Sequence, residues 1–282
     1  MVDSWQSKDL PQPESSKIAI EWFEVKFNET LTQINDLFDK FKISEALMAI
    51  YKLVWDDFCS WYLEMIKPGY KQPIDAKTLG QTKVFFEELL KLAQPFTPFI
   101  AEELWHLIRD RKEGEDIIVA EWPKVKKVDS SILKSFEEAV EVITNIRNIR
   151  KKNNIANKVK MELFVKTNGE IDKSMDSVIS KMGNLSSLEY VTEKVAQANG
   201  FIAGGNEFYI PFGDAIDVEA EKAKLSEELN YAKGFLKSVH NKLKNEKFMA
   251  GAPEKVVAIE KKKEADALGK IAILEEKLAE LN

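Results

Sequence analysis

Apolar residues recur at alternating three- and four-residue steps over much of the chain, which is the spacing of amphipathic helices. In the first half of the sequence this spacing predicts four bundle helices joined by short connections. Their predicted starts lie near Ile20, near Ser44 as an N-cap, near Asp75 and near Ser130. The third helix should restart after a kink, with Thr97 as cap and Pro98 at the first helical position. Residues 1–156 are therefore expected to form an all-helical bundle.

The pattern changes to the apolar–polar alternation of strands between residues 157 and 216. Three segments alternate in this way: "VKMELFVK", "LEYVTEKV" and "NEFYIPF". A Gly-Gly-Asn turn precedes the last segment, and "DKSMDSVISKM", which lies between the first two, is compatible with one helix. Residues 157–216 are therefore interpreted as a small α/β module.

Residues 217–282 show heptad spacing on both sides of a break at Gly251 and Pro253. In an antiparallel hairpin, facing positions have residue numbers with a constant sum, and the apolar positions meet this condition with a sum of about 500. The pairs include Leu225 with Leu274, Leu229 with Ile271 and Ala232 with Ala267. The same arithmetic pairs Leu236 with Glu264 and Val239 with Glu260, so the seam should be looser there. An antiparallel coiled-coil arm is predicted, and the whole chain is expected to be mainly α.

Composition limits the class of protein. The chain has 282 residues, of which 44% are hydrophobic and 31% charged, as is typical of a folded, soluble protein. It contains no apolar run long enough for a membrane span and no signal peptide, so a cytoplasmic location is expected. The single cysteine, Cys59, excludes an internal disulfide and a thiolate zinc site, and core packing is the expected role of its side chain.

Residues that could carry out catalysis are scarce. The two histidines, His106 and His240, lie far apart in the sequence and far from Cys59, which argues against a catalytic triad and a metal cluster. The glycines of "FIAGGNE" lack the Lys-Ser/Thr that would follow in a phosphate-binding loop. We therefore predict no catalytic residue, no metal site and no cofactor in this chain.

Local charge is more informative than the net charge of −6. The segment "NIRNIRKKNNIANKVK", residues 145–160, contains six cationic residues and no acid, and its candidate contacts to a polyanion are Arg147, Arg150, Lys151 and Lys152. In the arm, lysines gather toward the break, and the candidate contacts there are Lys237, Lys242, Lys244, Lys247 and Lys255. A charge run is usually a solvated surface, but two cationic segments in one acidic protein favour an extended polyanion such as folded RNA.

The helix "YKLVWDDFCSWYLEMIKP" is rich in aromatic residues that could stack on RNA bases. Tyr51, Trp55, Phe58 and Tyr62 form one stripe at helical spacing, which favours packing in the bundle core. One or two rings at the edge of the stripe can still be exposed, and Trp61 and Tyr62 are kept as candidate RNA contacts.

Three segments resemble a known family: "ISEALMAIYKLVWDDFCSWYLEMIKP", "QPFTPFIAEELWHLI" and "IRNIRKKNNIA" are similar to the helical anticodon-binding domain of class I aminoacyl-tRNA synthetases. The arm segment "KLKNEKFMAGAPEKVVAIEKKK" resembles the tRNA-binding coiled coil of the valine enzymes, and the resemblance extends over essentially the whole chain. It implies a bundle that faces the anticodon stem-loop of a valine-accepting tRNA and an arm that reaches the tRNA elbow.

The catalytic signatures of that family, a His-x-Gly-His-type motif and a Lys-Met-Ser-Lys-Ser-type loop, are absent from this sequence. The resemblance therefore implies the C-terminal part of a valine–tRNA ligase, monomeric and inactive alone, with ATP and Mg²⁺ belonging to the catalytic domain in the remainder of the synthetase. Two alternatives remain open: a coiled-coil interaction protein that dimerises through its seam, and a general RNA-binding protein without an enzyme parent.

Overall fold

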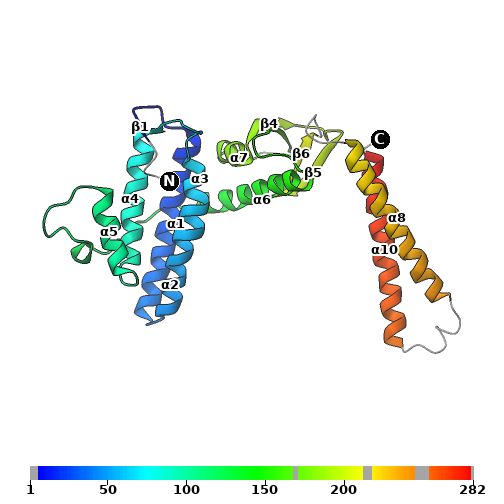
Figure 1. Ribbon diagram of the computed structural model, residues 1–282, viewed down its shortest axis with the longest axis horizontal. Coiled ribbons are helices and arrows are strands. Elements are labelled where there is room, and N and C mark those ends of the chain that lie inside the picture. Colours follow the sequence, from blue (N-terminus) through cyan, green and yellow to red (C-terminus); the bar gives the residue numbers. More distant parts are fainter. Residues whose placement is uncertain (1–5, 168–170, 212–217, 245–253, 281–282) are drawn as a thin grey trace. The chain divides into compact units, whose positions relative to one another are not determined.

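The computed structural model describes residues 6–167, 171–211, 218–244 and 254–280. The chain is mainly helical, with one two-stranded and one four-stranded sheet in the described ranges (Figure 1). It divides into two compact units, Met1–Ile146 with Gly169–Leu188, and Arg147–Asn168 with Glu189–Asn282. No helix of the described ranges is long and apolar enough to cross a bilayer.

The first unit is a helical bundle. Its elements are α1 (Glu14–Asp39), α2 (Ile43–Lys52), the π-helix η2 (Leu53–Tyr62), α3 (Leu63–Ile66), α4 (Ala76–Ala93), α5 (Pro98–Ile108), the 3-10 turn η3 (Ile117–Val119), α7 (Asp176–Gly183) and most of α6 (Ser131–Lys152). Phe23 is fully buried at the centre, with ring centroids of Phe58, Tyr62 and Phe85 at 5.2, 5.1 and 5.0 Å. A short parallel pair, β1 (Ser7–Lys8) and β2 (Ile74–Asp75), contacts α4 at its start.

The helix starts were predicted with mixed success. α4 begins at Ala76, next to its predicted start at Asp75, and Asp75 caps it, because its Oδ1 accepts a hydrogen bond from the backbone N–H of Thr78 at 2.8 Å. Pro98 is the first residue of α5 as expected, although the Thr97 hydroxyl donates back to the Ala93 carbonyl and caps nothing. The prediction that Ser44 caps the second helix was wrong: α2 already begins at Ile43, without a side-chain cap.

A tight connection explains that early start. Phe41 adopts a left-handed backbone conformation with φ of 56°, and it is 88% exposed. The backbone N–H groups of Phe41 and Lys42 donate to the carbonyls of Phe38 and Leu37, which ends α1 and leaves Lys42 directly before α2.

The aromatic stripe does not lie on one buried face. Phe58 and Tyr62 are buried as predicted, but Tyr51 and Trp55 are 54% and 59% exposed, and Cys59 is exposed too. The prediction of core packing was therefore wrong for these three residues. Within each pair the rings still share a face, since Tyr51 stacks on Trp55 and Phe58 on Tyr62. The wider turns of η2, in which each hydrogen bond spans five residues instead of four, separate the face of the first pair from that of the second.

The four-stranded sheet has the order β4-β3-β6-β5. Its strands are β3 (Met161–Lys166), β4 (Leu185–Val191), β5 (Ala198–Ala203) and β6 (Asn206–Pro211). The predicted strands "VKMELFVK" and "NEFYIPF" correspond to β3 and β6, while β4 covers only the first half of the predicted "LEYVTEKV" and begins three residues before it. β5 was not predicted. β5 and β6 form an antiparallel hairpin that pairs Ala203 with Asn206 and turns at Gly204 and Gly205, both with positive φ.

Two long helices, α8 (Val218–Leu243) and α10 (Glu254–Glu280), contact each other over apolar side chains. The buried members of this cluster are Leu225, Ala232, Ile271 and Leu274, and the partly buried members are Leu229, Leu236 and Leu278. Most of these residues occupy positions that were predicted to face each other because their residue numbers sum to about 500. The predicted turn at Gly251 and Pro253 lies outside the described residues.

Candidate nucleic-acid interface

The cationic segment, residues 145–160, begins in the last turns of α6 and continues beyond the end of this helix at Lys152. The chain reverses at Asn154, where φ is 53°, and the Ile155 N–H donates to the Arg150 carbonyl at 2.9 Å. Most cationic side chains of the segment are exposed: Arg147, Lys151, Lys152, Lys158 and Lys160. They could contact a polyanion without rearrangement of the backbone.

Arg150 is the exception, because it is only 6% exposed. Its Nη1 donates to the carbonyl of Val159 at 2.7 Å and to that of Ala156 at 3.4 Å, and burial lowers its pKa. The guanidinium therefore fastens the returning chain to the end of α6. Of the predicted contacts, Arg150 is therefore the one whose side chain stabilises the fold of the cationic segment.

The predicted arm contacts divide into described and undescribed residues. Lys237, Lys242 and Lys244 lie on the last turns of α8 or directly after it, and Lys237 and Lys242 have exposed side chains. Lys242 Nζ is 3.9 Å from Glu260 Oε1, an oxygen that also pairs with Lys263 at 2.9 Å. Lys247 lies outside the described residues. Lys255 lies in α10, but its side chain is outside the described part of the structure.

The two predicted aromatic contacts differ in accessibility. Tyr62 is fully buried, its hydroxyl is hydrogen-bonded to Thr82 Oγ1 at 2.8 Å, and burial raises its pKa. It offers no ring face to a base. Trp61 is half-buried and lies edge-on to Phe136, with ring centroids 5.5 Å apart. Its exposed part could still contact RNA.

A more accessible aromatic pair was missed. The rings of Tyr51 and Trp55 stack with centroids 6.3 Å apart and an interplanar angle of 10°, and more than half of each side chain is exposed. Both residues belong to the aromatic helix whose rings were considered for base stacking. They were assigned to the core because the spacing of an α-helix placed them in line with Phe58 and Tyr62. Stacked, exposed rings of this kind can receive an unpaired base.

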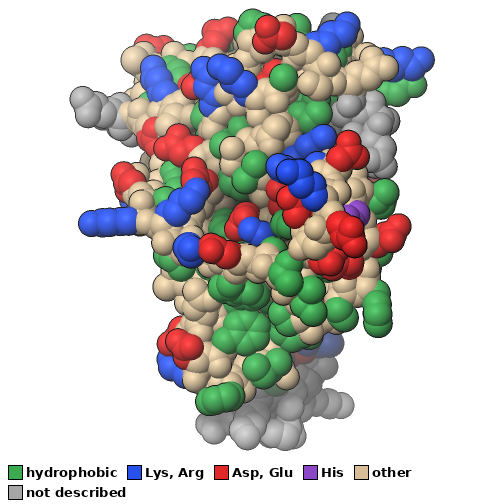
Figure 2. Space-filling model, turned by 90° about the vertical axis from the view of Figure 1, so that its left-hand side faces the viewer, with side chains coloured by type: hydrophobic (Ala, Val, Ile, Leu, Met, Phe, Trp, Pro, Cys, Tyr) green, Lys and Arg blue, Asp and Glu red, His purple; other side chains and the backbone are tan. Residues whose placement is uncertain are grey.

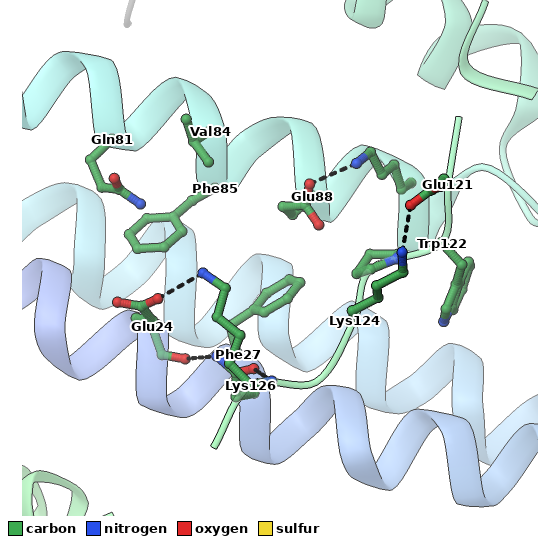
Figure 3. A pocket seen from close by; sticks show the side chains of 13 residues that line it. Glu24, Phe27, Gln81, Val84, Phe85, Glu88, Glu121, Trp122, Lys124 and Lys126 are labelled. Atoms are coloured by element: carbon green, nitrogen blue, oxygen red, sulfur yellow. Dashed lines mark hydrogen bonds and ion pairs between the residues drawn. The ribbon is translucent and has the colours of Figure 1, made fainter. Parts of the chain in front are cut away.

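A cavity of about 310 Å³ lies in the bundle between α1, α4 and the segment of residues 121–126 (Figure 3). Phe27 and Phe85 contribute to its apolar lining. The charged groups at its rim are paired: Lys126 Nζ is 3.0 Å from Glu24, and Lys124 Nζ is 2.7 Å from Glu121. The paired charges give this cavity no excess of positive charge for a phosphate.

Comparison with known proteins agrees with these features. Residues 21–166 match the anticodon-binding domain of tRNA ligase, and residues 217–282 match the valyl tRNA synthetase tRNA binding arm. The cationic segment 145–160 falls within the first match and the lysine-rich part of the arm within the second.

Similar proteins are named valine–tRNA ligases. The chain is 50% identical over its full length to the one from Christiangramia forsetii and 49% identical to the one from Parabacteroides distasonis, and it covers 32% of each. A relative from Enterococcus faecalis is 31% identical over 99% of this chain. The chain thus spans about a third of the length of these relatives. It belongs to the family of tRNA ligases with this anticodon-binding domain, and its C-terminal helices belong to the tRNA-binding arm of the valyl-tRNA synthetases.

Proposed function

We propose that this chain is the tRNA-binding C-terminal region of a cytoplasmic valine–tRNA ligase. The bundle would hold the anticodon stem-loop, and the arm of α8 and α10 would contact the tRNA elbow. The observation that carries this proposal is that each cationic segment lies within a domain match that is itself described as anticodon- or tRNA-binding. Backbone phosphates supply much of the affinity of most RNA-binding proteins, and exposed lysine and arginine side chains are their natural partners.

The proposed contacts of the cationic segment are the exposed cations at the end of α6, namely Arg147, Lys151 and Lys152, which belong to the second unit. In the bundle, Trp61 is a proposed contact. The stacked pair Tyr51 and Trp55 is added to it, because its exposed rings suit an unstacked base of a single-stranded loop. Arg150 and Tyr62 are given supporting roles, since both are buried and hydrogen-bonded within the protein.

For the arm, we propose an antiparallel coiled coil that presents Lys237, Lys242, Lys244, Lys247 and Lys255 to the RNA. The apolar cluster supports this arrangement, because Leu225 and Ala232 of α8 and Ile271 and Leu274 of α10 bury one another's side chains. A rigid two-helix arm can hold its lysines far from its base without a large globular core.

The test is direct binding of tRNA to the purified chain, followed by fluorescence anisotropy with valine-accepting and other tRNA transcripts. Four to six phosphate contacts would make affinity fall on the order of a hundredfold or more for a fourfold rise in salt concentration. A flat salt response would contradict the electrostatic interface. Equal affinity for all transcripts would support a general RNA-binding protein instead.

The activity of the whole ligase is also a proposal, because the chain spans only about a third of its relatives. The ligation of valine to tRNA with ATP and Mg²⁺ is assigned to the remainder of the synthetase. The chain alone should therefore show no valine-dependent pyrophosphate exchange, and measurable exchange would overturn this division of roles.

The chain is proposed to act as a monomer. Sedimentation over a range of protein concentrations separates this from the coiled-coil interaction protein. A mass that doubles with concentration, with no effect of tRNA, would favour that alternative.

A further inference from the structure

Three potential metal ligands meet at the outer side of α5. Glu102 and His106 lie four residues apart on this helix, and Asp116 belongs to the loop that leads into η3. His106 Nε2 lies 2.9 Å from Glu102 Oε1 and 3.2 Å from Asp116 Oδ1. One ligand atom from each of the three residues lies within 4.8 Å of the other two. Figure 2 looks onto this side of the molecule and shows acidic side chains gathered around a histidine.

The separations of these atoms suit a shared ion. Zinc binds histidine nitrogen and carboxylate oxygen at about 2.0–2.2 Å, so neighbouring ligands in a tetrahedral or octahedral site lie roughly 3 to 3.5 Å apart. The distances from His106 Nε2 to the two carboxylate oxygens already fall in or next to this range. Small rotations of exposed side chains would therefore place all three atoms around one ion.

The backbone holds Asp116 in place beside the helix. Trp105 Nε1 donates to the carbonyl of Glu115 at 2.8 Å, and the Ile117 N–H donates to Glu102 Oε1 at 3.3 Å. The Ile117 side chain is only 3% exposed and belongs to the apolar cluster of Trp105. Both neighbours of Asp116 are thus fixed to α5, so an ion would meet ligands that are largely positioned in advance.

The local charge also favours a cation. The nearby cations Arg109 and Arg111 are both engaged by the buried carboxylate of Glu87, at 2.6 and 2.5 Å. The guanidinium of Arg111 lies 3.4 Å from the centre of the Trp105 ring. Glu87 offsets one of these two positive charges. Residues 102–119 carry six carboxylates and three cationic side chains, which is a net charge of −3 without Glu87.

We propose that Glu102, His106 and Asp116 form a binding site for a divalent first-row transition-metal ion such as Zn²⁺. His106 Nε2 and one oxygen of each carboxylate are the protein ligands, and water completes the coordination. An imidazole ligand selects such ions over Mg²⁺ and Ca²⁺, which prefer oxygen ligands. The ion would fasten the loop of residues 109–119 to α5. The site does not depend on the proposed tRNA interface.

The test uses the two histidines of the chain. His240 is a matched control, because its Nε2 also pairs with a carboxylate, Glu264 Oε1 at 2.5 Å, but it is not part of a three-ligand group in the described structure. Zn²⁺ is titrated into the full chain at neutral pH, and the imidazole resonances are followed by NMR. The His106 resonance should shift and saturate at one ion per chain, while the His240 resonance should stay in place. Equal shifts of both resonances, or no shift of His106, would overturn the proposal.

Three variants test the ligand set. His106→Gln should abolish saturable binding, and Glu102→Gln and Asp116→Asn should each weaken it by about tenfold or more. His240→Gln should bind Zn²⁺ as the unaltered chain does. Circular dichroism melting without metal checks that each variant is folded. The site is refuted if the Glu102 and Asp116 variants bind Zn²⁺ with unchanged affinity while folded.

Discussion

Arg150→Met should destabilise the protein without removing a tRNA contact, whereas Arg147→Met should remove a tRNA contact without destabilising the protein. Methionine keeps most of the aliphatic length of the arginine side chain but cannot donate a hydrogen bond. The two residues lie three positions apart on α6, one buried and one exposed. They therefore form a matched pair that separates support of the cationic segment from contact with RNA.

The magnitude follows from the contacts of the Arg150 guanidinium. Its donation to the Val159 carbonyl at 2.7 Å is a short bond from a charged donor, and that to Ala156 at 3.4 Å is weak. A hydrogen bond to a charged group contributes about 1.5–3 kcal/mol, so the variant should lose about 2–3 kcal/mol. With a urea slope of about 2 kcal/mol/M, the unfolding midpoint should fall by about 1 M or more. Amide exchange at Ile155, whose N–H donates to the Arg150 carbonyl, should accelerate in parallel.

The assay combines urea unfolding with tRNA anisotropy in the absence of urea. Arg147→Met should keep the unfolding midpoint and bind tRNA more weakly. If Arg150→Met has an unchanged midpoint, the bond to the Val159 carbonyl does not stabilise the protein. If it weakens tRNA binding more than Arg147→Met does while remaining folded, then Arg150 is a contact, and the division between the two arginines is refuted.

Three further predictions concern charged side chains. Burial raises the pKa of Asp57 to about 6, above its ordinary value of 3.8, so folded-state stability should fall as pH rises through this interval. Asp57→Asn should then be more stable than the unaltered chain at pH 8 but not at pH 3.5, as measured by urea unfolding, and equal gains at both pH values would contradict the assignment. Glu260 is 6% exposed, and its Oε2 has no hydrogen-bond partner among the described residues; Glu260→Leu should therefore raise the thermal midpoint of helix melting, and a lowered midpoint would show that its ion pairs outweigh its burial. Lys237→Glu with Lys244→Glu should keep helicity and weaken tRNA binding at low salt, and unchanged affinity would remove these lysines from the interface.

The apolar cluster of α8 and α10 was the part of the fold that could be predicted best. Positions that should face each other follow from residue numbers alone, and four members of the predicted pairs are buried in the cluster: Leu225, Ala232, Ile271 and Leu274. The pairing itself stays a prediction. The bundle helices were likewise visible from their spacing. β5 escaped prediction because its Gly200 packs against the ring of Tyr209 on β6, a contact that only the folded hairpin creates.

Individual side chains were harder to predict than elements. A count of charges treats Arg147 and Arg150 alike. It does not show that the chain folds back after α6 and places the backbone carbonyls of residues 156 and 159 beside the Arg150 guanidinium. Similarly, no spacing rule brings Asp116 beside His106. That proximity arises because the chain leaves α5 after His106 and returns to it ten residues later. The indole of Trp105 and the buried side chain of Ile117 hold the returning segment against α5.

The π-helix η2 has a consequence for how this sequence can change. A π-helical turn accommodates one residue more than an α-helical turn, so deletion of one residue between Leu53 and Tyr62 would restore α-helical hydrogen bonding. The wide turns thereby absorb an extra residue without rotating the helix on either side, so the deletion would leave α2 in phase with α3, and Ala46 and Ile50 would stay in the core. The same deletion in a purely α-helical stretch would turn everything beyond it by about 100°. Single-residue deletions in η2 should therefore be tolerated better than single-residue deletions in α1, while substitutions of Tyr51 or Trp55 are limited only by what these exposed rings bind.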